Sequence, residues 1–347
     1  MMNHDLASPS FQNVVRKFSK SMDMRDLNRD FDWIKKIAGE QKRLSNITRG
    51  NAHPRKCCPI CESKHSTSVV NVFGFDYSEC GQCRHIYLED LPSKEAIQSL
   101  YTSNGDSQAV QGQIYLDEDL FNKRLRKIAE PKVKAIADFA VSSKTWLDIG
   151  CGTGENLFAA RNLGYKVSGI EADRAEVRFA SSKNIEVTNE FVGEDFNRPE
   201  LLGNVDIVTS FNVLEHIENP VPWVNNLASQ MRSGALLFFE VPRTPSLSNL
   251  TRQLFPDLAY RHIYPPDHLH IFSERAMEII FDKAGCSVQF VWNFGQDVFE
   301  LLSAAACQTG LKDRKIFDQV MNISGALQAA VDQNSMSDIM IIGARKI

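Results

Sequence analysis

The chain has 347 residues, enough for about two domains, with 39 basic and 43 acidic side chains and a formal net charge of −4. A pI near 6.1 excludes the strongly basic character expected of many nucleic-acid-binding domains. No apolar run is long enough to span a bilayer, and Met1 to Asp5 lack a signal-peptide pattern. We therefore expect a cytoplasmic protein with no membrane partner, and the balanced charge argues against a nucleic-acid partner.

The first 55 residues are polar, with short apolar patches around Phe31 and Ile37. They predict one or two helices on the body of the protein or a partly disordered leader. Residues 91–143 have a helical pattern, with one helix expected over 92–101 and a longer helical segment over 117–141. This second stretch is interpreted as a helical linker or cap.

Five of the eight cysteines lie between Cys57 and Cys83. Two C-x2-C pairs separated by eighteen residues match the spacing of a closed, tetrahedral zinc site, which predicts these ligands: Cys58, Cys61, Cys80 and Cys83. Three neighbours could each replace one ligand: Cys57, His65 and His85. Residues 56–90 thus predict a zinc ribbon with structural Zn²⁺, which would fold a module too small for its own core; a coincidental cysteine cluster is the alternative.

The next feature is the stretch Thr145-Trp-Leu-Asp-Ile-Gly-Cys-Gly-Thr-Gly-Glu155. Its apolar start predicts a buried strand, and the residues after it predict a helix that ends before Gly164. The turn between them holds three glycines, Gly150, Gly152 and Gly154, which let a ligand approach the backbone. Glu155 stands where a dinucleotide fingerprint requires its last glycine, and the acidic Asp148 favours a cationic ligand.

The string Leu-Asp-Ile-Gly-Cys-Gly-Thr-Gly closely resembles motif I of the class I S-adenosylmethionine (SAM) methyltransferases. The resemblance implies that the turn backs the methionine part of SAM. It also implies that the Asp148 carboxylate helps to hold the ammonium group of SAM.

Residues 144–347 alternate strand and helix patterns, which predicts an α/β, doubly wound, Rossmann-like sheet. The second strand, over 166–173, places Glu171 where a carboxylate can accept the ribose hydroxyls, with Asp173 as the alternative. The third strand or its end lies within 189–195. There the family resemblance implies an acidic contact to the adenine amino group, by Asp195 in preference to Glu194.

The stretch 205–217 reads as the fourth strand and its following turn, and it resembles motif IV of small-molecule methyltransferases. Some quinone-biosynthesis O-methyltransferases place a metal-binding Glu, Glu and His at the spacing of Asn212, Glu215 and His216. Since the first position here is Asn212, a catalytic metal is not expected. Asn212 would contact SAM or the substrate, and His216 would cap or orient the site, unless Glu215 and His216 only start a helix.

The fifth strand, 235–242, is almost wholly apolar and ends with Glu240 at the ligand edge of the sheet. The long loop after it contains Asp-His-Leu-His-Ile-Phe-Ser273, which resembles an element of SAM enzymes from bacterial sugar and polysaccharide clusters. His268 is the candidate general base, because an imidazole titrates near working pH. His270 is its competitor, and a buried, backbone-bonded histidine is the alternative.

A sixth strand over 286–294 and a closing strand over 337–345 complete an expected seven-stranded sheet. The helical pattern at about 296–335 predicts an insertion that forms a lid, part of the acceptor pocket or a homodimer surface.

Taken together, residues 57–345 resemble bacterial methyltransferases with an N-terminal zinc module. The resemblance implies methyl transfer from SAM to an oxygen or carbon of a small hydroxylated metabolite, such as a sugar, nucleotide-sugar or glycan precursor. The alternatives are an RNA methyltransferase that binds RNA through its ribbon and a non-catalytic scaffold that keeps SAM for structure.

Overall fold

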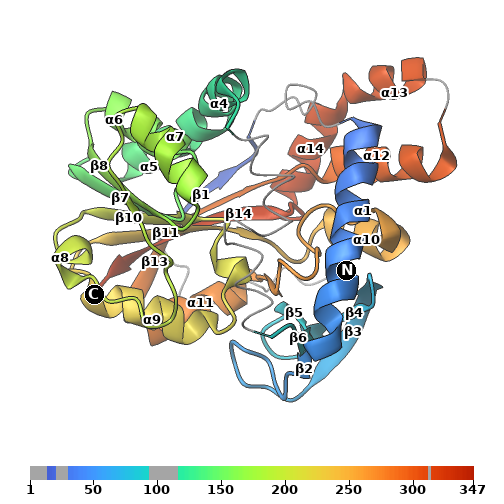
Figure 1. Ribbon diagram of the computed structural model, residues 1–347, viewed down its shortest axis with the longest axis horizontal. Helices are drawn as coiled ribbons and strands as arrows, with labels where there is room; N and C mark the ends of the chain where they lie inside the picture. The colour runs from blue at the N-terminus through green and yellow to red at the C-terminus, as the bar shows by residue number, and fades with distance from the viewer. Residues whose placement is uncertain (1–13, 21–29, 94–115, 312–313) are drawn as a thin grey trace.

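The computed structural model describes residues 14–20, 30–93, 116–311 and 314–347. Its centre is an eight-stranded sheet in the order β1-β13-β14-β11-β10-β7-β8-β9 (Figure 1). In that order the strands are Val15–Phe18, Cys286–Phe294, Ile339–Lys346, Leu236–Pro242, Ile207–Phe211, Thr145–Ile149, Lys166–Glu171 and Val187–Asn189. Every pairing is parallel except those of β14, which runs antiparallel to both of its neighbours.

The predicted doubly wound α/β fold is confirmed, but the prediction of seven strands is one short. The additional strand, β1, comes from the N-terminal leader and pairs with β13, with Val15 opposite Phe290. It has four residues, two of them the charged Arg16 and Lys17, and most of it is exposed. Such an edge strand is held mainly by backbone hydrogen bonds, so it leaves no hydrophobic alternation in the sequence.

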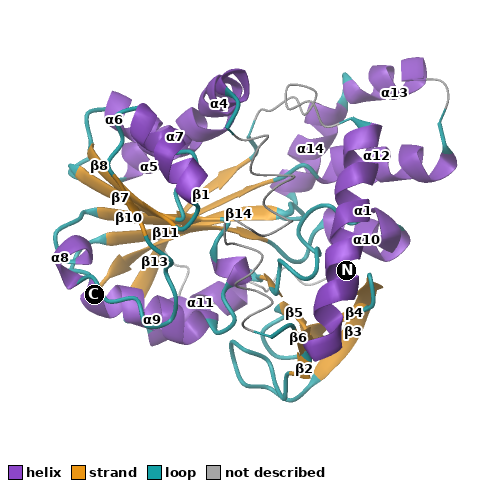
Figure 2. Ribbon diagram, in the orientation of Figure 1, coloured by secondary structure: helices purple, strands orange, loops and turns teal. Residues whose placement is uncertain are grey.

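Helices cover both faces of the sheet, as Figures 1 and 2 show. One face carries α4 to α7 and the other α8, α9 and α11. Their bounds are Glu118–Arg124 (α4), a π-helical turn at Leu125–Ala129, Glu130–Phe139 (α5), Glu155–Asn162 (α6), Arg174–Ser182 (α7), Pro199–Leu202 (α8), Pro220–Gln230 (α9) and Glu274–Lys283 (α11). The central strand β11 is buried along its whole length, as expected of a strand packed on both faces.

The cysteine-rich segment forms a small separate sheet in the order β12-β5-β4-β3, with its strands at His270–Ile271, Ile86–Leu88, Phe75–Cys80 and Ser66–Val72. A short β2–β6 pair, His53–Pro54 with Asp90–Leu91, lies beside it. Strand β12 comes from the long loop after β11 and pairs with β5. The loop that carries the candidate base is therefore part of the cysteine-rich sheet.

The remaining helices gather beyond the C-terminal ends of β11 and β13 (Figure 1). They are Phe31–Thr48 (α1), Leu247–Leu254 (α10), Asp297–Thr309 (α12), Arg314–Met321 (α13) and Ser324–Gln333 (α14), with 3₁₀ turns at Arg49–Asn51, Leu214–His216 (η5) and Pro256–Leu258. Helices α12 to α14 occupy the expected insertion. The helix expected at 92–101 falls largely outside the described residues, and the proposed domain boundaries stay predictions. In the described part of the chain, no helix combines the length and apolar character needed to cross a membrane.

Candidate cofactor and acceptor site

The glycine turn follows β7 and opens helix α6. Gly150 and Gly154 have φ angles of +71° and +87°, in the left-handed region that favours glycine. A Cβ atom on Gly150 would lie 2.4 Å from a methyl group of Val213. The turn therefore requires glycine at this position for both conformation and space.

Asp148 lies at the end of β7, directly before this turn, and is 1% exposed. Its Oδ1 accepts a hydrogen bond of 2.6 Å from the Thr209 hydroxyl, whereas its Oδ2 is buried without a hydrogen-bond partner among the described residues. Burial raises the pKa of Asp148 to about 7, and the Thr209 hydrogen bond offsets only part of this rise. An orphaned carboxylate oxygen of this kind suits a cationic ligand group.

Glu171 reaches the same turn from the end of β8. Its carboxylate accepts hydrogen bonds from the backbone N–H groups of Gly152, at 2.9 Å, and Asp173, at 2.8 Å. Burial raises its pKa. Asp173, the alternative ribose contact, is the N-cap of α7 and accepts from the N–H groups of Ala175 and Glu176. Because capping accounts for Asp173, these contacts favour Glu171 as the ribose residue, and that role stays a prediction.

Glu176 is a further acidic residue at the turn, and sequence reasoning missed it. Its carboxylate would be 3.7 Å from a Cβ on Gly152. Burial raises the pKa of Glu176 to about 8, and the charge of Glu171 adds to the rise. Glu176 lies in the first turn of an amphipathic helix, so no sequence signal separates it from an ordinary helix-start acid.

The predicted adenine contact lies in the loop between β9 and α8. Asp195 is exposed there. Glu194, its alternative, accepts a 2.7 Å hydrogen bond from the Asn219 amide. Among the described residues, Asp195 is therefore the acid of this pair that is not held by a side-chain hydrogen bond, and its adenine role stays a prediction.

Asn212 and Glu240 meet at the C-terminal ends of β10 and β11. Asn212 has a φ angle of +56°, and its backbone N–H donates to the Glu240 carbonyl at 2.9 Å. The Glu240 carboxylate forms a buried ion pair with Lys132 of α5. Lys20 lies in the same region; burial and the charge of Lys132 lower the pKa of Lys20 to about 7. Neither lysine was predicted, because the fold brings both from segments that precede the SAM motif.

The histidines His268 and His270 have different surroundings. His270 is fully buried, with Nδ1 3.0 Å from His85 Nε2 and Nε2 3.0 Å from the Ile217 carbonyl. His268 Nδ1 is buried without a hydrogen-bond partner among the described residues. Burial, with the neighbouring His216, lowers the pKa of His268 well below its usual range. The expectation that this imidazole titrates near working pH is therefore wrong for the unliganded protein, and its ring is neutral. These contacts support His268 over His270 as the reactive imidazole.

His268 packs edge-on against His216, with ring centroids 4.7 Å apart. His216 Nδ1 lies 2.7 Å from the Asp267 carbonyl, and burial lowers the pKa of this ring to about 4. Glu215 beside it is 0% exposed, and burial raises its pKa to about 8. The candidate ligand atoms of Glu215, His216 and His268 all lie within 4.8 Å of one another. The sequence spacing placed Glu215 and His216 together. It gave no sign that the loop after β11 would bring His268 next to them.

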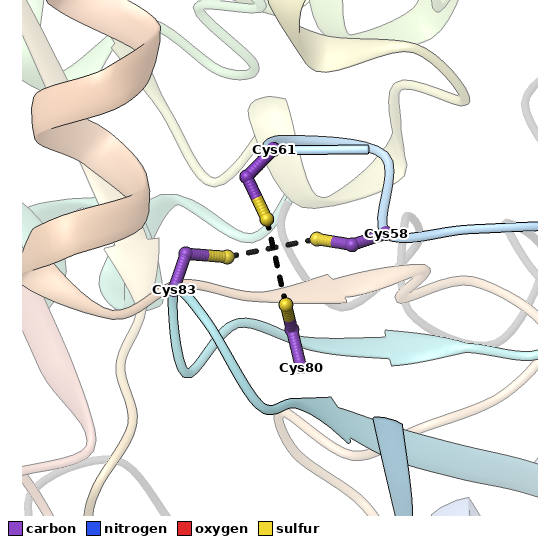
Figure 3. A group of neighbouring side chains, drawn as sticks. All are labelled: Cys58, Cys61, Cys80 and Cys83. Carbon is purple, nitrogen blue, oxygen red and sulfur yellow. Dashed lines mark hydrogen bonds between the residues drawn. The ribbon is translucent and has the colours of Figure 1, made fainter. Parts of the chain in front are cut away.

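The four predicted cysteine ligands converge, as Figure 3 shows. The Sγ atoms of Cys58 and Cys83 are 3.6 Å apart, and those of Cys61 and Cys80 are 3.5 Å apart. These separations fit the sulfur–sulfur distance of about 3.8 Å in a tetrahedral zinc site with Zn–S bonds of about 2.3 Å. Cys57, His65 and His85 are not in the group, and all eight cysteines are free. The donor set thus suits zinc with the predicted ligands.

The cysteine-rich sheet also holds the histidine loop in place. The Tyr77 hydroxyl donates to the His268 carbonyl at 2.7 Å, and the Leu88 N–H donates to the Leu269 carbonyl at 3.0 Å. The Leu269 N–H in turn donates to the Glu215 carbonyl at 2.8 Å. The module therefore fixes the backbone at His268 and at the residue that follows it.

Comparison with known proteins identifies part of the chain. Residues 121–289 match the family model Methyltransf_23, described as a methyltransferase domain. The ubiquinone biosynthesis O-methyltransferase of Nitrosococcus oceani is 27% identical over 129 residues, 35% of this chain and 55% of that protein. The cypemycin N-terminal methyltransferase of a Streptomyces species is 26% identical over 104 residues, 29% of this chain and 42% of that protein. The chain thus spans about half the length of these curated relatives.

Among solved structures, the magnesium protoporphyrin IX methyltransferase of Synechocystis PCC 6803 aligns with a TM-score of 0.48 and 14% identity, over 74% of this chain and 100% of that one. The family match covers the glycine turn, Glu171, the η5 turn and the histidine loop. This chain therefore carries a methyltransferase domain with a Rossmann-like α/β fold.

Proposed function

We propose that the protein transfers a methyl group from SAM to an oxygen or carbon of a small hydroxylated metabolite. The observation that carries this proposal is the acidic cradle around the glycine turn, formed by Asp148, Glu171 and Glu176. Asp148 is buried, and Glu171 and Glu176 are half-buried. In their ionised forms these carboxylates would repel a pyrophosphate but attract a ligand with an ammonium and a sulfonium group.

The residues around the turn fit the parts of SAM. Asp148 would hold its ammonium group, and Glu171 its ribose hydroxyls. Gly150, Gly152 and Gly154 would let its methionine part lie against the backbone. SAM supplies an activated methyl group, so the protein mainly needs to align the acceptor and exclude water. Asp195 would contact the adenine amino group of SAM. Asn212 would contact SAM at the C-terminal ends of the strands, where the methyl group is transferred.

The acceptor side would lie between η5, the end of β11 and the histidine loop. His268 Nδ1, a neutral nitrogen without a partner among the described residues, would accept the acceptor proton. His216 would hold the ring of His268 by its edge contact. The ion pair with Lys132 would hold the Glu240 carboxylate in a fixed position at the end of β11.

The four cysteines would bind structural Zn²⁺. Four thiolates close the coordination shell, which leaves no position for substrate. Through Tyr77 and β5, the bound ion would order the loop that carries His268. Eight free cysteines also fit the reducing environment of a cytoplasmic protein.

The proposed acceptor is a sugar, nucleotide-sugar or glycan precursor. By their names, the relatives above are an O-methyltransferase of ubiquinone biosynthesis and an N-terminal methyltransferase of cypemycin, which supports methyl transfer but not a particular acceptor. The test is methyl transfer from labelled SAM into a fractionated extract of the source organism, with Asp148→Asn as the inactive control. Label in the small-molecule fraction supports the proposal and yields a compound to identify, whereas label in RNA would overturn the proposed acceptor class.

A further inference from the structure

The N-terminal strand β1 brings one lysine, Lys20, to the ligand edge of the central sheet. Because β1 runs parallel to β13, its C-terminal end lies beside the C-terminal end of β13. Arg16 of β1 pairs with Glu274 of α11 at 2.9 Å. The Ser19 N–H donates to the Asn293 carbonyl at 2.9 Å. Lys20 directly follows this anchored stretch and therefore lies at the edge where ligands of open α/β sheets bind.

Two lysines and one carboxylate lie close together at this edge. Glu240 forms its buried ion pair with Lys132, whose ammonium group is 5.5 Å from the centroid of the Phe211 ring. The Lys20 ammonium group is 5.3 Å from the centroid of the Phe294 ring, and it forms no ion pair with an acid of the described residues. Lys20 is half-buried, and the charges of Lys132 and Glu240 both act on it. When both lysines are protonated, this group carries one positive charge that Glu240 does not neutralise.

We propose that Lys20 binds an anionic group of the methyl acceptor, a carboxylate or a phosphate. An ammonium group that is partly withdrawn from water is stabilised by a charged partner, and the described residues supply none within ion-pair distance. Burial and the charge of Lys132 lower the pKa of Lys20 to about 7. A bound anion would raise this pKa again, because an opposite charge favours the protonated amine.

The inference rests on the proposed methyltransferase function and narrows its acceptor class. Nucleotide-sugars and acidic sugars fit an anion site at Lys20, whereas neutral sugars do not. The acids around the glycine turn attract the cationic cofactor, and the lysines at the ends of β1 and α5 attract an anionic acceptor. An acceptor of this kind would bind with its anionic group turned away from the glycine turn.

The first experiment measures anion binding without methyl transfer, with inorganic phosphate as the probe. The full-length protein is saturated with S-adenosylhomocysteine, and its melting temperature is followed as phosphate replaces chloride at constant ionic strength. Lys20→Met is compared with Lys17→Met, a matched control on β1 whose ammonium group is 5.8 Å from the centroid of the Trp292 ring. Equal affinity for S-adenosylhomocysteine in all three proteins shows that the cofactor site is intact.

Phosphate at about five times its Kd should raise the melting temperature of wild type and of Lys17→Met by about 2–4 °C. The same concentration should leave the melting temperature of Lys20→Met nearly unchanged. An equal rise in Lys20→Met and wild type, or no rise in wild type at any phosphate concentration, would overturn the inference.

The second experiment separates the labelled products of the extract by anion exchange. We expect label in the retained small-molecule fraction. Loss of retention after treatment with phosphodiesterase and phosphatase identifies the anionic group as a phosphate, and unchanged retention identifies it as a carboxylate. With this fraction as substrate, Lys20→Met should require about 10- to 100-fold more of it than Lys17→Met for a half-maximal rate.

The outcomes distinguish the anion site from the proposed function. Label confined to the unretained, neutral fraction, or equal half-maximal concentrations in the two variants, would overturn the role of Lys20 and leave methyl transfer to small molecules in place. Label in RNA, or in no fraction, would contradict the proposed function. In that case the phosphate titration alone decides whether Lys20 binds an anion.

Discussion

Replacing Asp148 with asparagine should weaken SAM binding and remove most of its pH dependence. The structure buries this carboxylate with one oxygen unpaired, and burial raises its pKa to about 7. Because the pKa is raised, the neutral acid predominates below that pH, and the charged form that attracts an ammonium group appears as the pH rises. The affinity of wild type for SAM should therefore increase from mildly acidic to mildly basic pH.

The size of the effect follows from the ionised fraction. With a pKa of about 7, that fraction rises from roughly one tenth at about pH 6 to roughly nine tenths at about pH 8. An affinity that requires the ionised form should then improve about tenfold over this range. The asparagine variant also loses a charged hydrogen bond of about 1.5–3 kcal/mol, or about 10- to 150-fold in Kd at the upper pH.

Isothermal titration with SAM across this pH range measures both quantities. The ligand's own titration and that of Glu176 are present in both proteins, so the difference between wild type and the variant isolates Asp148. Equal Kd values, or equal slopes of Kd against pH in the two proteins, would refute the assignment of Asp148 to the ammonium group.

Three further predictions concern the turn, the cysteines and the histidine loop. Gly150→Ala should lower the free energy of unfolding by about 1–3 kcal/mol and abolish S-adenosylhomocysteine binding. The reason is that the new Cβ would lie 2.4 Å from a Val213 methyl group, at a residue with positive φ. A melting temperature equal to that of wild type would contradict this prediction. Cys80→Ser should release the ribbon zinc, measured by metal analysis, and lower stability, whereas full retention of metal would exclude the four-cysteine site. Once an acceptor fraction is identified, His268→Ala should reduce turnover about 10²- to 10⁴-fold with unchanged S-adenosylhomocysteine affinity; undiminished turnover would remove its catalytic role.

Short sequence patterns predicted the features whose conformation depends mainly on residues close together in the chain. The strand, glycine turn and helix around Asp148 follow from burial, positive φ and helix periodicity within about twenty residues. The N-cap of α11 is similarly local, since the Ser273 side chain accepts a hydrogen bond from the Ala276 N–H three residues later. The two C-x2-C pairs likewise indicate metal binding from local sequence alone, since each pair places two thiols on one tight turn.

The sequence did not predict the edge strand β1, nor the places of Glu176 and Lys132 in the site. A short, charged edge strand is stabilised by pairing with β13, so its structure depends on a partner far away in the chain. Lys132 shares helix α5 with the exposed Lys134, and only its packing against the strand ends pairs it with Glu240.

The sequence by itself determined the fold class, the cofactor turn and the four cysteines, because each depends on residues close together in the chain. Only the tertiary structure shows how the surroundings of His268 and His270 differ, because the two residues have similar sequence surroundings. Burial of His270 between His85 and the Ile217 carbonyl engages both of its nitrogens. His268 instead lies against His216 and Glu215, some fifty residues earlier, because strand β12 pairs with the cysteine-rich sheet and carries the loop across the strand ends.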